Sequence, residues 1–219
     1  MGPALAGMRD HTNTFPKETP NVWKSQFTNG GLGQTVAISD NLLAVKAPSD
    51  FIEEEKGVVY MYKRGADGIY EEVDRLSSPE GGLYTPEGEQ STPSNSPQIA
   101  LLDDFVLVGA PGLNAVHVFQ ETPLGRYQKV SELVAFDATP GSNRAFGYRL
   151  DGDGMDVLVS DPVDNSSYSF FYDNGVWNGG CKHGSAAFYV SSPTSRPATV
   201  ISVASKQNEF GPVNVYDIV

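Results

Sequence analysis

Residues 105–119 read Phe-Val-Leu-Val-Gly-Ala-Pro-Gly-Leu-Asn-Ala-Val-His-Val-Phe, which is two short apolar runs joined by a Gly-Ala-Pro-Gly turn. Short apolar runs bounded by turn residues are typical of strands that are buried on both faces. The same half-unit recurs three more times along the chain, with decreasing fidelity. This repetition predicts a fold assembled from similar antiparallel β units.

Each unit has a second run and a third run at matching places. Their anchors are Val45, Val108, Val159 and Val203 in the second runs, and Tyr62, Phe119, Tyr172 and Tyr216 at the ends of the third. The first three units continue into a fourth run, headed by Tyr70, Tyr127 or Trp177. The last unit lacks this run, whereas residues 21–28, headed by Trp23, form a strand without a partner. We therefore expect residues 21–28 to complete the last unit, which would leave no open sheet edge.

The fold expected from this pattern is all-β: a small four-bladed β-propeller, closed by an N-terminal strand that completes the last blade. Residues 1–20, which are polar and carry three prolines, are expected to form an N-terminal arm, and residues 21–219 the propeller domain. The expected blades span residues 31–78, 97–137, 146–182 and 184–219, the last together with 21–28. The 23 glycines and 15 prolines favour many tight turns and argue against long helices. An alternative is a seven-bladed ring that another protomer completes.

Charge and hydropathy limit the classes of partner. Fifteen Lys and Arg residues against 27 Asp and Glu give a net charge of −12, which repels nucleic acid and anionic membranes. No segment approaches the roughly 20 apolar residues of a membrane helix, and no signal peptide is visible, so membrane insertion is not expected and the compartment stays open. The single cysteine, Cys181, cannot form an internal disulfide and is expected to be a small packed side chain.

The chain resembles the FG-GAP repeat family, whose best-known members are the integrin α-subunit heads. Phe146-Gly147 is similar to the first element of that repeat, with Leu32-Gly33 and His183-Gly184 as weaker forms. Gly109-Ala110-Pro111 matches the second element in full, and Lys46-Ala47-Pro48 and Ser160-Asp161-Pro162 match it in part. Residues 57–62 and 211–216 resemble the third element, Gly-x-Val-x-Val-Tyr. The resemblance implies propeller blades, although members of the family typically have seven.

Residues 150–156, Leu-Asp-Gly-Asp-Gly-Met-Asp, resemble the calcium loops of some FG-GAP blades. Asp151, Asp153 and Asp156 could supply three carboxylates to Ca²⁺, which takes about six to eight oxygen ligands. The loop is short and has no equivalent in the other units, and Asp-Gly pairs are turn formers first. A plain turn is therefore the favoured interpretation, with no cofactor, and calcium binding is the alternative.

No catalytic constellation is visible. Paired carboxylates occur at residues 53–55, 71–72 and 103–104, as in glycosidases, but acidic surface clusters are commoner than active sites. His183 and Cys181 supply only two candidate metal ligands, and no Gly-x-Ser-x-Gly motif occurs. The aromatic residues that head the outer strands, Trp23, Tyr70, Tyr127 and Trp177, are expected to pack between blades in preference to stacking on sugars.

The expected function is therefore that of a non-catalytic protein–protein interaction module or a structural subunit of a larger assembly. Its candidate contact surfaces are the loops at residues 50–56, 77–96 and 138–144, because rigid β scaffolds bind through their loops. The expected partners are proteins, and glycans are an alternative. A lectin-like propeller and a glycan-acting hydrolase are the rival functions.

Overall fold

The structure is a computed structural model, and it describes residues 32–33, 35–39, 41–52, 55–77, 99–139, 142, 144–184, 187–191, 198–206 and 209–218. These residues form an all-β fold of four antiparallel sheets, in which neighbouring strands are consecutive in sequence. Such meanders need only short turns, which the abundant glycines supply. No helix of the described residues is long and apolar enough to cross a membrane.

The four sheets follow one another along the chain. The first sheet contains β1 (Thr35–Ile38), β2 (Leu42–Ile52), β3 (Glu55–Arg64) and β4 (Tyr70–Leu76). The second contains β5 (Ile99–Leu101), β6 (Phe105–Ala110), β7 (Ala115–Glu121) and β8 (Tyr127–Val134). The third contains β9 (Arg149–Asp153), β10 (Asp156–Asp161), β11 (Ser166–Asp173) and β12 (Val176–His183). The fourth contains β13 (Ala187–Ser191), β14 (Ala198–Lys206) and β15 (Glu209–Ile218).

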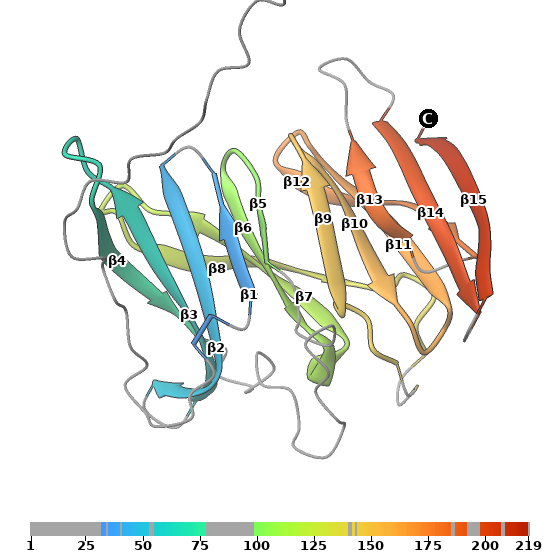
Figure 1. The fold of residues 1–219 in the computed structure, drawn as a ribbon, viewed down its shortest axis with the longest axis horizontal. Coiled ribbons are helices and arrows are strands. Elements are labelled where there is room, and N and C mark those ends of the chain that lie inside the picture. Colours follow the sequence, from blue (N-terminus) through green and yellow to red (C-terminus); the bar gives the residue numbers. More distant parts are fainter. Residues whose placement is uncertain are drawn as a thin grey trace, which may run out of the picture.

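The sheets lie side by side in chain order, from β1–β4 at one end to β13–β15 at the other (Figure 1). The first strand of each sheet contacts the first strand of the next: β1 lies against β5, β5 against β9, and β9 against β13. No contact of comparable extent joins the first and fourth sheets within the part of the chain that the structure describes. These residues therefore form an arc of sheets, and the strand expected at residues 21–28 lies outside them.

Strand β6 shows why the apolar runs of the sequence are continuous. All six of its residues are buried, because the second sheet packs against a neighbour on each face. Val106 and Val108 join the apolar cluster shared with the first sheet, whereas Phe105 and Leu107 join the cluster shared with the third. A strand that is buried on both faces has no polar side to alternate with.

The junction between the second and third sheets depends on a glycine. Gly147 has φ +90°, and a Cβ built there would lie 2.3 Å from the carbonyl oxygen of Ala115. Its N–H donates to the carbonyl oxygen of Ser160 at 3.2 Å. Gly33, with φ +89°, donates in the same way to the carbonyl oxygen of Lys46 at 3.0 Å. The Leu-Gly and Phe-Gly pairs of the sequence therefore occupy equivalent places in the first and third sheets.

Two elements were not expected from the sequence. Strand β9 covers residues that read as a polar loop, because only Leu150 among its five residues is buried and its pairing with β10 decides its conformation. Pro111–Leu113 forms a short 3₁₀ turn after β6, closed by Asn114 in the left-handed conformation at φ 55°. Both features are local departures within the predicted meander.

Candidate functional site

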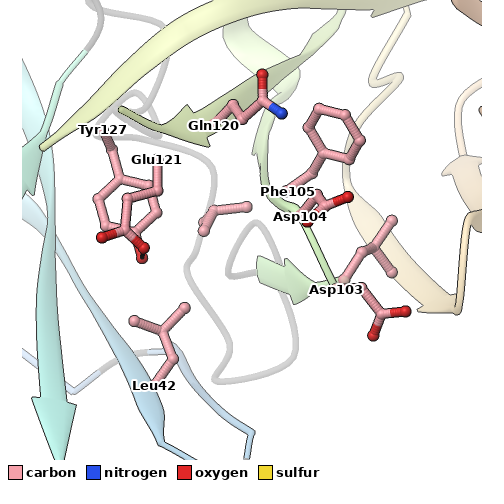
Figure 2. Close-up of a pocket in the computed structure, with 9 residues that line it drawn as sticks. Leu42, Asp103, Asp104, Phe105, Gln120, Glu121 and Tyr127 are labelled. Carbon is pink, nitrogen blue, oxygen red and sulfur yellow. Dashed lines mark hydrogen bonds between the residues drawn. The ribbon is translucent and has the colours of Figure 1, made fainter. Parts of the chain in front are cut away.

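A polar cleft of about 470 Å³ lies between the first and second sheets. It is lined by the polar residues Ser39, Asn41, Lys63, Asp103, Glu121 and Tyr127 and the apolar residues Leu42, Leu101 and Leu102. A smaller hollow of about 130 Å³ shares five of these residues and adds Asp104, Phe105, Val106 and Gln120. The two hollows therefore form one continuous site, part of which is shown in Figure 2.

Turns at one end of the two sheets bring these residues together. The N–H of Ser39 donates to the carbonyl oxygen of Leu42 at 2.9 Å and closes the β1–β2 turn. The N–H of Leu102 donates to the carbonyl oxygen of Phe105 at 2.9 Å and closes the β5–β6 turn around Asp103 and Asp104. In a meander, the first and third turns lie at the same end of the sheet, so the ends of β3 and β7 meet these turns.

Lys63 and Glu121 form an ion pair across the cleft, from β3 of the first sheet to β7 of the second. The hydroxyl of Tyr127 lies 3.5 Å from the other carboxylate oxygen of Glu121. Burial, and then the negative charge of Glu121, raise the pKa of Tyr127 to about 12, so its hydroxyl stays protonated at neutral pH. The site therefore holds a carboxylate, an ammonium and a neutral hydroxyl in contact.

Asp74 fixes the position of Tyr127 from the neighbouring sheet. The backbone N–H of Tyr127 donates to Asp74 Oδ2 at 2.6 Å. The side chain of Arg126 donates to Asp74 Oδ1 at 2.9 Å. One carboxylate of β4 therefore holds the start of β8, and with it the tyrosine side of the cleft.

Two further carboxylates belong to the lining of the same hollow. In Figure 2, Asp103 and Asp104 lie on one side of the pocket and Glu121 and Tyr127 on the other. Carboxylates can accept a proton from water or hydrogen bonds from ligand hydroxyls, and the protonated tyrosine can donate to a carbonyl oxygen. The arrangement is suited to acid–base chemistry on a small polar molecule.

Of the acidic clusters in the sequence, the structure brings Asp103 and Asp104 into the cleft. Glu71 and Glu72 lie on β4, where Glu72 accepts a hydrogen bond from Arg75 Nε at 2.6 Å. Residues 53 and 54 lie outside the described residues, and Glu55 begins β3. The adjacent acids Asp103 and Asp104 could be found in the sequence, but the residues that share the cleft with them, such as Lys63 and Glu121, come from distant strands.

The predicted calcium residues lie in the β9–β10 hairpin. Asp151 and Asp153 belong to β9 and Asp156 begins β10, with Asp153 paired opposite Asp156 across the two-residue turn. Among the described residues, no group of three or more His, Cys, Asp or Glu side chains is arranged to hold a metal ion. Gly154 and Met155 form the turn between these two strands, and calcium binding by them stays untested.

The outer-strand aromatics differ in their surroundings. Trp177 packs against Phe105 of the second sheet, with ring centroids 5.4 Å apart, and so lies between two neighbouring sheets. Tyr127 packs against the cluster of the first two sheets and also lines the cleft. Tyr70 packs against the other face of the first sheet, and Trp23 lies outside the described residues. Aromatic packing and the candidate site therefore coincide at Tyr127.

The expectation for Cys181 is wrong. Its side chain is exposed, because it lies on β12, the outermost strand of the third sheet. Its backbone N–H donates to Ser169 Oγ at 2.8 Å, which fixes the strand without burying the thiol. His183, two residues later, is buried at the end of the same strand.

A second polar cluster surrounds the hydroxyl of Tyr168 and was not found from the sequence. Arg144 donates to this oxygen at 2.7 Å, and Asp137 accepts from it at 2.8 Å. Lys182 pairs with Asp137 and with Asp164, at 2.6 and 2.7 Å. The hydrogen bond from Lys182 lowers the pKa of Asp137 to about 2.

This cluster ties the segment between β8 and β9 to the third sheet. The loop expected as a contact surface at residues 138–144 is held at its end, because Arg144 lies 3.5 Å from the buried carboxylate of Asp161. Most of the loop expected at residues 50–56 belongs to strands, because β2 runs to Ile52 and β3 starts at Glu55. Of the loop expected at residues 77–96, residues 78–96 lie outside the described residues. No contiguous motif marks the cluster, since its members are far apart in sequence.

No protein-family model matches this sequence, and no curated protein matches it either. Among solved structures, the fold is similar to a crystal structure described as that of a "putative 6-phosphogluconolactonase" from Bacteroides uniformis, with a TM-score of 0.52 and 11% sequence identity. The match covers 84% of this chain and 56% of that chain, so this chain spans little more than half of its length. The likeness is one of fold.

This likeness corrects the function expected from the sequence. The prediction of a non-catalytic interaction module or structural subunit assumed that repeated sheets without a catalytic motif supply surface alone. A similar arrangement of sheets occurs in a protein described as a "putative 6-phosphogluconolactonase", and this finding contradicts the prediction.

Proposed function

We propose that this chain is a hydrolase of cyclic esters, with its active site in the cleft between the first and second sheets. The observation that carries the proposal is the cluster of Glu121, Lys63 and Tyr127, which lines a cleft of about 470 Å³ together with Asp103. This volume suits a small ring. The fold likeness to a protein named as a lactonase supports the same reaction class.

Glu121 is the general base of the proposed reaction, and Lys63 orients it. Glu121 accepts a proton from a water molecule while the water oxygen forms a bond to the ester carbonyl carbon. The hydroxyl of Tyr127 donates a hydrogen bond to the carbonyl oxygen as negative charge develops there. The ring C–O bond then breaks, and the ring oxygen takes the proton back from Glu121. The product is the open hydroxy acid.

The test is lactone hydrolysis with D-glucono-1,5-lactone, measured as acid release above the spontaneous rate. We expect Glu121→Gln to lower kcat by about 100-fold or more, because a positioned general base contributes roughly that factor. Glu132→Gln, on β8 of the same sheet but outside the lining of the cleft, is the matched control and should keep the parent rate. Equal kcat for the parent and Glu121→Gln would refute the proposed site, and no rate above background in the parent would refute the proposed activity.

We also propose that the four sheets are consecutive blades of a β-propeller made of FG-GAP-like repeats. The equivalent hydrogen bonds of Gly33 and Gly147 support the repeat, and the contacts between first strands support the blade arrangement. Closure of a four-bladed ring by residues 21–28 stays a prediction. The described strands leave the arc open, which equally suits a larger ring.

A further inference from the structure

The charge of the cleft bears on which lactone it accepts. Its lining contains three carboxylates, from Asp103, Asp104 and Glu121, against the single ammonium of Lys63, which is a net charge of −2. Lys63 is already paired with Glu121. Among the described residues, no other Lys or Arg lines the two hollows. A phosphate group entering this site would meet repulsion on one side and an occupied cation on the other.

The rest of the lining suits an uncharged ring with hydroxyl groups. Leu42, Leu101 and Leu102 offer apolar surface to the C–H face of a ring. Ser39 and Asn41 add neutral groups that donate and accept hydrogen bonds, and the free oxygens of Asp103 and Asp104 accept from hydroxyls. This mixture of apolar surface with a few convergent polar groups is typical of small-molecule sites.

We infer that the cleft selects uncharged, hydroxyl-rich ring compounds and rejects their phosphate esters. The inference rests on the proposed function, because it names the substrate class of the same site. The selectivity comes from Asp103 and Asp104, whose negative charge no Lys or Arg among the described lining residues compensates. It opposes what a transfer of the neighbour's printed name would suggest, namely a phosphorylated lactone.

The experiment compares D-glucono-1,5-lactone with its 6-phosphate in the parent and in Asp103→Asn/Asp104→Asn. We expect kcat/KM of the parent to be at least about tenfold higher for the uncharged lactone, and the double variant to remove most of that ratio. High salt should narrow the ratio in the parent, because the repulsion is screened. The charge-matched control is Asp173→Asn/Glu71→Gln, which also removes two carboxylates, at exposed positions on β11 and β4 outside the lining, and it should leave the ratio unchanged.

Binding of glucose and glucose 6-phosphate, followed by NMR titration, separates the two proposals because it needs no turnover. Preference for glucose that Asp103→Asn/Asp104→Asn removes, without lactone hydrolysis, would uphold the selectivity and refute the hydrolase. Equal or tighter binding of the phosphorylated sugar, or faster hydrolysis of the phosphorylated lactone, would overturn the selectivity. Failure of both sugars to bind would overturn it as well.

Discussion

Lys46 is a basic residue in apolar surroundings. It lies on β2 opposite Val59 of β3, its side chain is completely buried, and its ammonium nitrogen has no hydrogen-bond partner among the described residues. Ala44, two residues earlier on the same face, belongs to the cluster shared with the second sheet. Burial lowers the pKa of Lys46 from 10.5 to about 7. Above about pH 7 the fold therefore holds a mostly uncharged amine at its first sheet interface.

The stability of the protein should depend on pH through Lys46. The amine of Lys46 binds a proton near pH 10.5 in the unfolded chain but only near pH 7 in the folded chain. The free energy of unfolding is therefore highest above pH 10.5 and decreases as the pH falls toward 7. We expect urea unfolding to show a loss of about 2–3 kcal/mol between about pH 9.5 and 7.5, relative to Lys46→Met. The exposed Lys129→Met is the control. Identical pH slopes for the parent and Lys46→Met would contradict the buried neutral amine.

At the scale of elements, a calcium-dependence measurement tests whether the β9–β10 hairpin is a plain turn or a calcium loop. We expect the melting temperature of the parent to be the same with added Ca²⁺ and with chelator, because the described residues contain no group arranged to hold a metal. The triple variant Asp151→Asn/Asp153→Asn/Asp156→Asn should behave in the same way. A calcium-dependent rise in the parent that the variant lacks would restore the calcium interpretation. Differential scanning calorimetry gives the measurement.

Individual strands were predicted well where burial governs them. Strand β6 has the bounds expected from its apolar run, because both of its faces lie in the core. Strand β9 was missed, since its conformation comes from pairing with β10 and not from its own residues. Among the residues of the cleft, the sequence indicated Asp103 and Asp104 as paired carboxylates and Tyr127 as a packing aromatic residue. Lys63 and Glu121 meet through the packing of two sheets, which a local pattern does not contain.

At the scale of the whole molecule, the open edge of the fourth sheet needs explanation. Among the described strands, β15 is paired on one side only, with β14, and a ten-residue edge strand is a site of aggregation. If residues 21–28 complete this sheet, deletion of residues 1–28 should cause concentration-dependent aggregation, detected by light scattering. Deletion of residues 1–20 alone is the control and should stay soluble. A soluble 1–28 deletion that melts like the parent would refute the closing strand.

The architecture as a whole was only partly contained in the sequence. Repeated anchors such as Val108 and Phe119 predicted four all-β units, and four sheets are present. The way in which the units meet could not be read from the repeats, because the packing of sheets depends on contacts between different units. The contacts between the first strands of successive sheets are of this kind, and so is the similarity to just over half of a longer chain.

The close approach at Gly147 has a consequence for how such chains diverge. Because the backbone of the third repeat lies on the backbone of the second, main-chain atoms fix the spacing of the two sheets at this point. Core side chains on either side can then change in size, one pair at a time, while that spacing persists. Drift of the surrounding sequence is therefore compatible with an unchanged fold, in keeping with a structural likeness at 11% identity.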